Sequence, residues 1–110
     1  MESLSAYEKF ILAYLWYEYG GSLYFSRGSE DPELFLAKLI TNELVKGTKP
    51  YFYDRLLQNL VNSFKRLKEN WMIELSGYEV NLTIYGRQIV QGIGKEEYEK
   101  IKKKLASGKS

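Results

Sequence analysis

The sequence lacks cysteine and histidine altogether, and its 110 residues include only two prolines. Without cysteine, the chain has no disulfide framework and no thiolate metal site. Without histidine, it lacks the commonest metal ligand and the commonest general base near neutral pH. We therefore predict that the protein is not an enzyme, with no catalytic residue, no metal site, no cofactor and no evident small-molecule substrate.

A long apolar run is also missing. The longest apolar-rich stretch, residues 10–17, has eight residues, whereas a membrane-spanning helix needs about 20. The first residues carry no basic cluster of the kind that opens a signal peptide. We expect a protein of the cytoplasm that does not contact a membrane.

The sequence does contain enough apolar material for one folded domain. Hydrophobic residues make up 45% of the chain and aromatic residues 15%, which excludes a disordered polypeptide. The length fits a single domain. We predict one domain over residues 1–105 and a flexible tail over residues 106–110, where the side chains are small and polar.

Charge is distributed unevenly along the chain, although the net charge is only +2. Residues 1–40 carry three basic and six acidic side chains, whereas residues 41–110 carry thirteen basic and eight acidic ones. A polyanionic partner would therefore bind the second part of the chain.

The apolar pattern predicts an α+β protein that is mostly helical. Residues 5–19 are apolar at helical spacing and around nearly the whole circumference, and Gly20 and Gly21 end this helix. Such a helix is buried on more than one side, and another subunit could supply the second side. The other predicted elements are a β run at 22–26, a helix from Pro32 to Val45 with Asp31 as N-cap, a helix at 51–70, strands at 71–75 and 78–83, a helix from Thr83 and a helix at 95–105.

The helix predicted at 51–70 has two different faces, placed by a rotation of about 100° per residue. One face is apolar and should lie in the core: Tyr53, Leu56, Leu57, Leu60, Val61, Phe64 and Leu67. The other face is polar: Arg55, Asn59, Asn62 and Arg66, flanked by Gln58 and Lys65. Arginine and amide side chains are the groups that read guanine and adenine in the major groove, although a solvated helix face has the same composition.

Two segments resemble winged helix-turn-helix proteins. Phe64–Glu74 is similar to the end of a recognition helix that runs into the wing, where the pattern L-x-R-L-E-E-x-G-L-I-E is common. Tyr78–Arg87 is similar to the second wing strand and the turn Y-x-L-T-x-x-G-R that opens the next helix. In this motif Thr83 caps the helix and Gly86 permits a close turn under the wing. Such segments occur in MarR-like and PadR-like regulators and in small winged-helix proteins of archaea and their viruses.

The chain departs from the family pattern at two places that matter for function. Trp71 stands where the family usually has glycine, and the wing tip at residues 75–78 has no basic side chain. The second departure removes the arginine or lysine that a wing would insert into the minor groove.

The resemblance implies a sequence-specific regulator of transcription that binds double-stranded DNA with the helix 51–70 in the major groove. The residues expected to contact DNA are Arg55, Gln58, Asn59, Asn62, Lys65, Arg66, Lys49, Thr48 and Arg87, with Lys46 and Tyr51 as further phosphate contacts. One alternative is a winged-helix module that binds another protein and no nucleic acid. Another is a single-strand binder, which would need an exposed tyrosine platform.

A homodimer is expected as well, because two-fold symmetry places two recognition helices on half-sites about 34 Å apart. The expected dimer contacts lie on the first and last helices, at Leu12, Trp16, Ile101 and Leu105. Abundant tyrosine, isoleucine, lysine and glutamate, together with the missing cysteine and histidine, indicate a thermophilic host.

Overall fold

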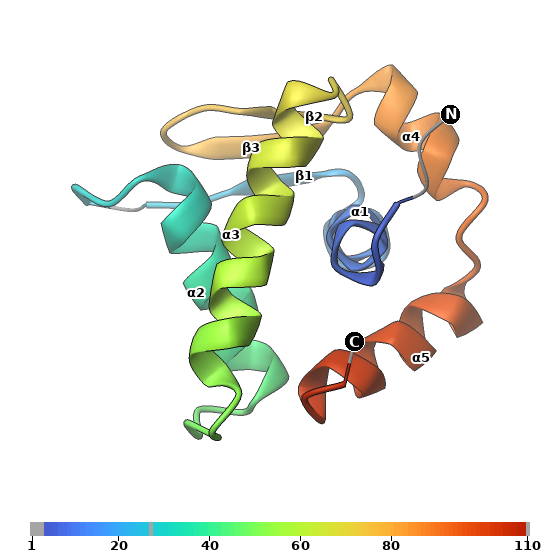
Figure 1. The fold of residues 1–110 in the computed structure, drawn as a ribbon. Helices are drawn as coiled ribbons and strands as arrows, with labels where there is room; N and C mark the ends of the chain where they lie inside the picture. The colour runs from blue at the N-terminus through green and yellow to red at the C-terminus, as the bar shows by residue number, and fades with distance from the viewer. Residues whose placement is uncertain (1–3, 27, 110) are drawn as a thin grey trace.

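The computed structural model describes residues 4–26 and 28–109. These residues form α1 (Ala6–Tyr19), β1 (Ser22–Tyr24), α2 (Pro32–Leu44), α3 (Tyr53–Glu69), β2 (Ile73–Leu75), β3 (Glu79–Leu82), α4 (Ile84–Val90) and α5 (Lys95–Ala106). The three strands form one antiparallel sheet in the order β1-β3-β2, so that the strand before α2 pairs with the last strand (Figure 1). The predicted α+β class and the predicted order of elements are confirmed.

Local sequence signals define both ends of α1. The Ser5 hydroxyl accepts a hydrogen bond from the Glu8 backbone N–H (3.1 Å), and the Glu8 carboxylate accepts one from the Ser5 N–H (2.8 Å). This reciprocal pair is a capping box, which satisfies two backbone donors at the start of a helix. At the other end Gly20 has a φ of 66° and closes the helix, as predicted.

Helix α1 lies at the centre of the fold, and its surroundings correct three of the four predicted dimer contacts. It contacts α3, α4, α5, β1 and β3, and Figure 1 shows it nearly end-on with α3 on one side and α4 and α5 on the other. Leu12 is completely buried, and Leu105 and Ile101 are 1% and 9% exposed. These three side chains therefore lie inside one chain, where they cannot contact a second copy. The chain's own α5 supplies the burial that we expected from another subunit.

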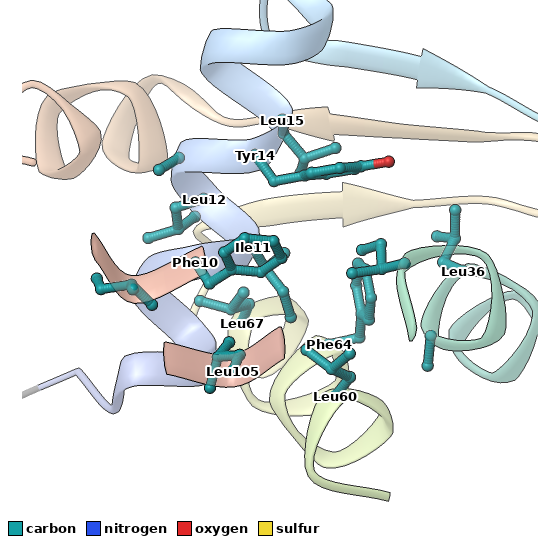
Figure 2. Packing of buried hydrophobic residues seen from close by; sticks show 14 of the residues in the cluster. Phe10, Ile11, Leu12, Tyr14, Leu15, Leu36, Leu60, Phe64, Leu67 and Leu105 are labelled. Carbon is teal, nitrogen blue, oxygen red and sulfur yellow. The ribbon is translucent and has the colours of Figure 1, made fainter. Parts of the chain in front are cut away.

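The apolar face of α3 was predicted correctly. Leu60 and Phe64 are completely buried, and Figure 2 shows both, with Leu67, in the core shared with Phe10 and Ile11 of α1. Leu36 of α2 and Leu105 of α5 reach the same cluster from opposite sides (Figure 2). The core thus fixes which face of α3 remains outside.

The sheet has one face in the core and one face outside, as expected for alternating strands. Val80 and Leu82 of β3 are buried, with Ile73 of β2 beside them. On the outer face the Ser22 hydroxyl donates to the Asn81 side-chain oxygen across the β1–β3 pair, at 2.6 Å.

Several predicted boundaries differ from the structure by one or two residues, and two of these differences have a clear physical cause. The strand predicted at 71–75 begins at Ile73, because Trp71 has a φ of 60° and cannot belong to a strand. The chain after Leu105 was expected to be a loose tail, but Ala106 still belongs to α5 and Lys109 donates to the Lys104 carbonyl at 2.9 Å. Ser110 lies outside the described residues.

Candidate nucleic-acid interface

Arg66 is the predicted DNA contact that the structure assigns most clearly to packing. Its guanidinium Nε lies 2.9 Å from a carboxylate oxygen of Glu8, and the Glu8 side chain is buried. A buried carboxylate needs a charged or hydrogen-bonded partner. Arg66 therefore holds α3 against the start of α1, and a DNA contact through the same guanidinium would compete with this ion pair.

Arg55 is also engaged, but by backbone and not by an acid. Its guanidinium donates to the carbonyl of Gly108 at 2.6 Å, across 53 positions of sequence. A carbonyl does not neutralise the guanidinium, so the positive charge of Arg55 remains at the start of α3. The structure therefore brings the residues after α5 to the first turn of α3.

The exposed centre of α3 consists of Gln58, Asn62 and Lys65. Gln58 donates to the Asn62 side-chain oxygen at 3.2 Å, so two of the predicted amides form one pair on adjacent turns. Asn59 is half-buried. The exposed carboxylates of Asp54 and Glu69 stand at the two ends of this surface. The face is therefore polar and mixed in charge, with its amides at the middle.

The turn before α3 carries exposed cations. Lys46 and Lys49 are both exposed, and the Lys49 ammonium lies 5.5 Å from the centre of the Tyr53 ring. Tyr51 is 94% exposed. The Thr48 hydroxyl donates to the Val45 carbonyl at 2.7 Å, which shapes the turn. Side chains of this kind are typical phosphate contacts.

Arg87, the remaining predicted contact, lies away from α3. Its guanidinium sits 5.7 Å from the centre of the Trp16 ring. It also covers Gly21, where an added Cβ would lie 3.1 Å from a guanidinium nitrogen. The motif arginine therefore joins α4 to the end of α1, and Trp16, one of the expected dimer contacts, is half-covered by it.

The β2–β3 hairpin is acidic and aromatic. Residues 73–82 contain Glu74 and Glu79 and no lysine or arginine. Tyr78 is 65% exposed, and the adjacent Tyr24 of β1 is 69% exposed. A hydrogen bond to Glu79 and the charge of that carboxylate raise the pKa of Tyr24. The hairpin therefore repels phosphate, whereas the turn before α3 attracts it.

A groove of about 510 Å³ lies where α3 meets the hairpin, with Trp71 as its largest side chain. Its wall has both signs of charge, from Glu33, Lys65, Lys68, Glu69 and Glu74, and two apolar residues, Ile73 and Leu75. Trp71 is 75% exposed and has a φ of 60°. The mixed charges favour neither an anion nor a cation.

The largest pKa shifts belong to two tyrosines that pack in the core. Burial raises the pKa values of the Tyr14 and Tyr98 phenols, with hydrogen bonds to Glu43 and Glu18 as a further cause.

Among residues 4–26 and 28–109 there is no group of three side chains suited to a metal ion. In the same described part, none of the helices is both long and apolar enough to cross a bilayer.

The contribution of the C-terminal residues was not predicted from the sequence. Gly108 has a φ of 86°, and its N–H and that of Lys109 donate to the Leu105 and Lys104 carbonyls. This is a Schellman motif, in which glycine ends a helix in the left-handed conformation. A glycine two residues after a helical pattern was the available signal for this ordered end.

Comparison of the chain with protein-family models, with characterised proteins and with solved structures finds no match.

Proposed function

We propose that the chain is a winged-helix protein that binds double-stranded DNA through α3 and the turn before it. The order of elements supports this, because a helix, a strand, two helices and a hairpin occur in the sequence expected from the resemblance. The proposed role is sequence-specific regulation of transcription, by a homodimer whose contacts lie elsewhere than Leu12, Ile101 and Leu105.

One observation carries the proposal: α3 exposes amides beside a cationic turn while its other face is fixed in the core. Gln58 and Asn62 lie at the middle of the exposed face, with Lys65 one turn further on. Lys46 and Lys49 precede the helix. A helix fits the major groove, where amides pair with adenine, while lysines bind the flanking phosphates. Binding would thus divide between base contacts from α3 and phosphate contacts from the turn.

The test is DNA binding by fluorescence anisotropy in a salt titration. The wild-type protein should bind a labelled duplex of mixed sequence, with an affinity that falls steeply as salt rises. Lys49→Ala/Lys65→Ala should lower the salt slope by about two units, because each phosphate contact contributes about 0.9. Gln58→Ala/Asn62→Ala should leave the slope unchanged and weaken binding only to a selected operator. Absence of duplex binding by the wild type at low salt would refute the proposal.

The second candidate is a protein–protein module, and the acidic hairpin favours it. Glu74 and Glu79 face outward beside the exposed Tyr24 and Tyr78. A protein partner with a basic surface would fit there, and DNA would not. Binding of such a partner without any binding of duplex DNA would select this alternative.

A further inference from the structure

The residues at the end of α5 lie against the start of α3, although they are far apart in sequence. The Arg55 guanidinium donates to the Gly108 carbonyl at 2.6 Å. Gly108 also lies directly against the Phe52 ring, so that an added Cβ would be 2.6 Å from a ring carbon. These two contacts fix the C-terminal turn, residues 103–109, beside the first turn of α3.

This juxtaposition gathers positive charge at one end of the molecule. Residues 46–55 contribute Lys46, Lys49 and Arg55, and the C-terminal turn contributes Lys103, Lys104 and Lys109. All six side chains are exposed, and Asp54 is the one carboxylate within these two ranges. Six of the sixteen basic residues of the chain thus belong to two short segments that lie side by side.

We propose that the C-terminal turn is part of the DNA-binding surface and binds the phosphate backbone beside the groove that α3 occupies. The inference rests on the proposed function, since the same duplex must lie against α3. Charge complementarity favours a polyanion here, and the defined backbone position of Gly108 fixes where the lysines stand. Arg55 then has two roles, because its guanidinium positions the turn and its charge adds to the surface.

The Schellman motif at the end of α5 explains how a lysine-rich segment keeps one position. Gly108 adopts a φ of 86°, and its N–H donates to the Leu105 carbonyl at 3.1 Å. Leu105 is anchored in the core at 1% exposure. The cations therefore extend from a fixed helix end, and they lose less conformational freedom on binding than lysines on a disordered tail would.

The experiment compares a pair of lysines from the C-terminal turn with a pair from the first half of α5. In a salt titration with a fluorescein-labelled duplex of mixed sequence, Lys104→Ala/Lys109→Ala should weaken binding about tenfold at moderate salt and lower the slope by about two units. The matched control, Lys95→Ala/Lys100→Ala, removes the same charge from exposed positions in the first half of α5. It should leave both quantities close to the wild-type values.

A second pair of variants changes position without changing charge. Gly108→Ala places a Cβ against Phe52 and should displace the turn, so that the salt slope falls although every lysine remains. Gly94→Ala is its control, because no atom lies within 4 Å of the added Cβ. Circular dichroism checks that all four proteins are folded.

The outcomes separate this inference from the proposed function. If the wild type binds duplex DNA but Lys104→Ala/Lys109→Ala behaves like the control pair, the C-terminal turn is not part of the surface and only this inference fails. If the wild type does not bind duplex DNA at all, both fail. If single-stranded DNA competes as well as the duplex does, the partner is wrong. A lower slope in Lys104→Ala/Lys109→Ala and in Gly108→Ala, with normal controls, supports the inference.

Discussion

The turns that end α2 and α3 each contain a residue other than glycine with a positive φ: Lys46 (54°) after α2, in the loop that leads to α3, and Trp71 (60°) after α3. Each belongs to a Schellman motif. Gly47 N–H donates to the Asn42 carbonyl at 3.0 Å in the first turn, and Met72 N–H donates to the Leu67 carbonyl at 3.0 Å in the second. The two turns therefore have the same backbone conformation and the same type of hydrogen bond.

The surroundings of the two turns differ. After α3 the chain is held tightly, because the Thr83 hydroxyl donates to the Trp71 carbonyl at 2.6 Å and Gly86 packs directly on Met72. Before α3 the side chains of Lys46 and Lys49 are exposed, and Asp54 is the one carboxylate within residues 46–55. One end of α3 thus provides mechanical attachment to the hairpin, and the other provides charge. The difference teaches that attachment and binding can be assigned to separate ends of one helix.

The largest expected effect comes from breaking the attached end. Gly86→Ala would put a Cβ 2.1 Å from the Met72 carbonyl oxygen, a distance that only a backbone shift can relieve. We expect a loss of more than about 3 kcal/mol in the free energy of unfolding, measured by urea denaturation. Gly94→Ala, with open space around its added Cβ, is the control. Equal stability of the two variants would mean that the hairpin is not fixed in this way.

Charge reversal in the turn before α3 should have the next largest effect, on the affinity for duplex DNA. Lys46→Glu/Lys49→Glu should weaken duplex binding about 100-fold at low salt, equivalent to about 2.7 kcal/mol, without changing stability. Glu74→Lys/Glu79→Lys, the opposite reversal on the hairpin, should leave binding unchanged or strengthen it. Equal weakening by both reversals would show that the two ends are not distinct.

Alkaline pH should lower the free energy of unfolding through Tyr98 of α5. Tyr98 is completely buried and its phenol donates to Glu18 at 2.8 Å, and burial raises its pKa above the ordinary 10.0. The folded state keeps this proton where the unfolded chain releases it. Stability is therefore fully present below about pH 10 and is lost above it, by about 1.4 kcal/mol per pH unit for each such phenol.

Urea unfolding at successive alkaline pH values measures this loss. Tyr98→Phe should show a shallower decline, with the buried phenol of Tyr14 accounting for what remains. An identical decline in the wild type and in Tyr98→Phe would contradict the assignment.

The smallest effect is expected at Trp71. A left-handed conformation costs a residue other than glycine roughly 1–2 kcal/mol, and asparagine tolerates it better than tryptophan. Because the indole is 75% exposed, it contributes little packing. Trp71→Asn should therefore raise the free energy of unfolding by up to about 1 kcal/mol. A decrease would mean that the indole packs against its groove more than its exposure indicates.

Periodicity predicted the elements and the buried face of α3, because both depend on neighbours three or four residues away. It could not predict the partners of the polar face. Arg66 pairs with Glu8, and Arg55 with the carbonyl of Gly108, across long separations in sequence. Local spacing contains no information about such contacts.

Three of the expected dimer contacts, Leu12, Ile101 and Leu105, were mispredicted for a related reason. The sequence indicated that the first helix needed burial on two sides, which is correct for Leu12. It did not indicate whether a second chain or a later helix would provide that burial. The helix cap at Thr83 and the close turn at Gly86 were predicted correctly, because a backbone requirement fixes each residue. Gly86 lies against Met72, and the Thr83 hydroxyl accepts from the Gly86 N–H at 2.9 Å.

The order β1-β3-β2 has a consequence for behaviour at high concentration. It leaves β1 and β2 as the edges of the sheet, and each is only three residues long. A strand from another molecule could form few hydrogen bonds to either edge, and the outward carboxylate of Glu74 would hinder it on β2. The sheet is thus a poor template for fibril growth, even though the chain is rich in tyrosine and isoleucine.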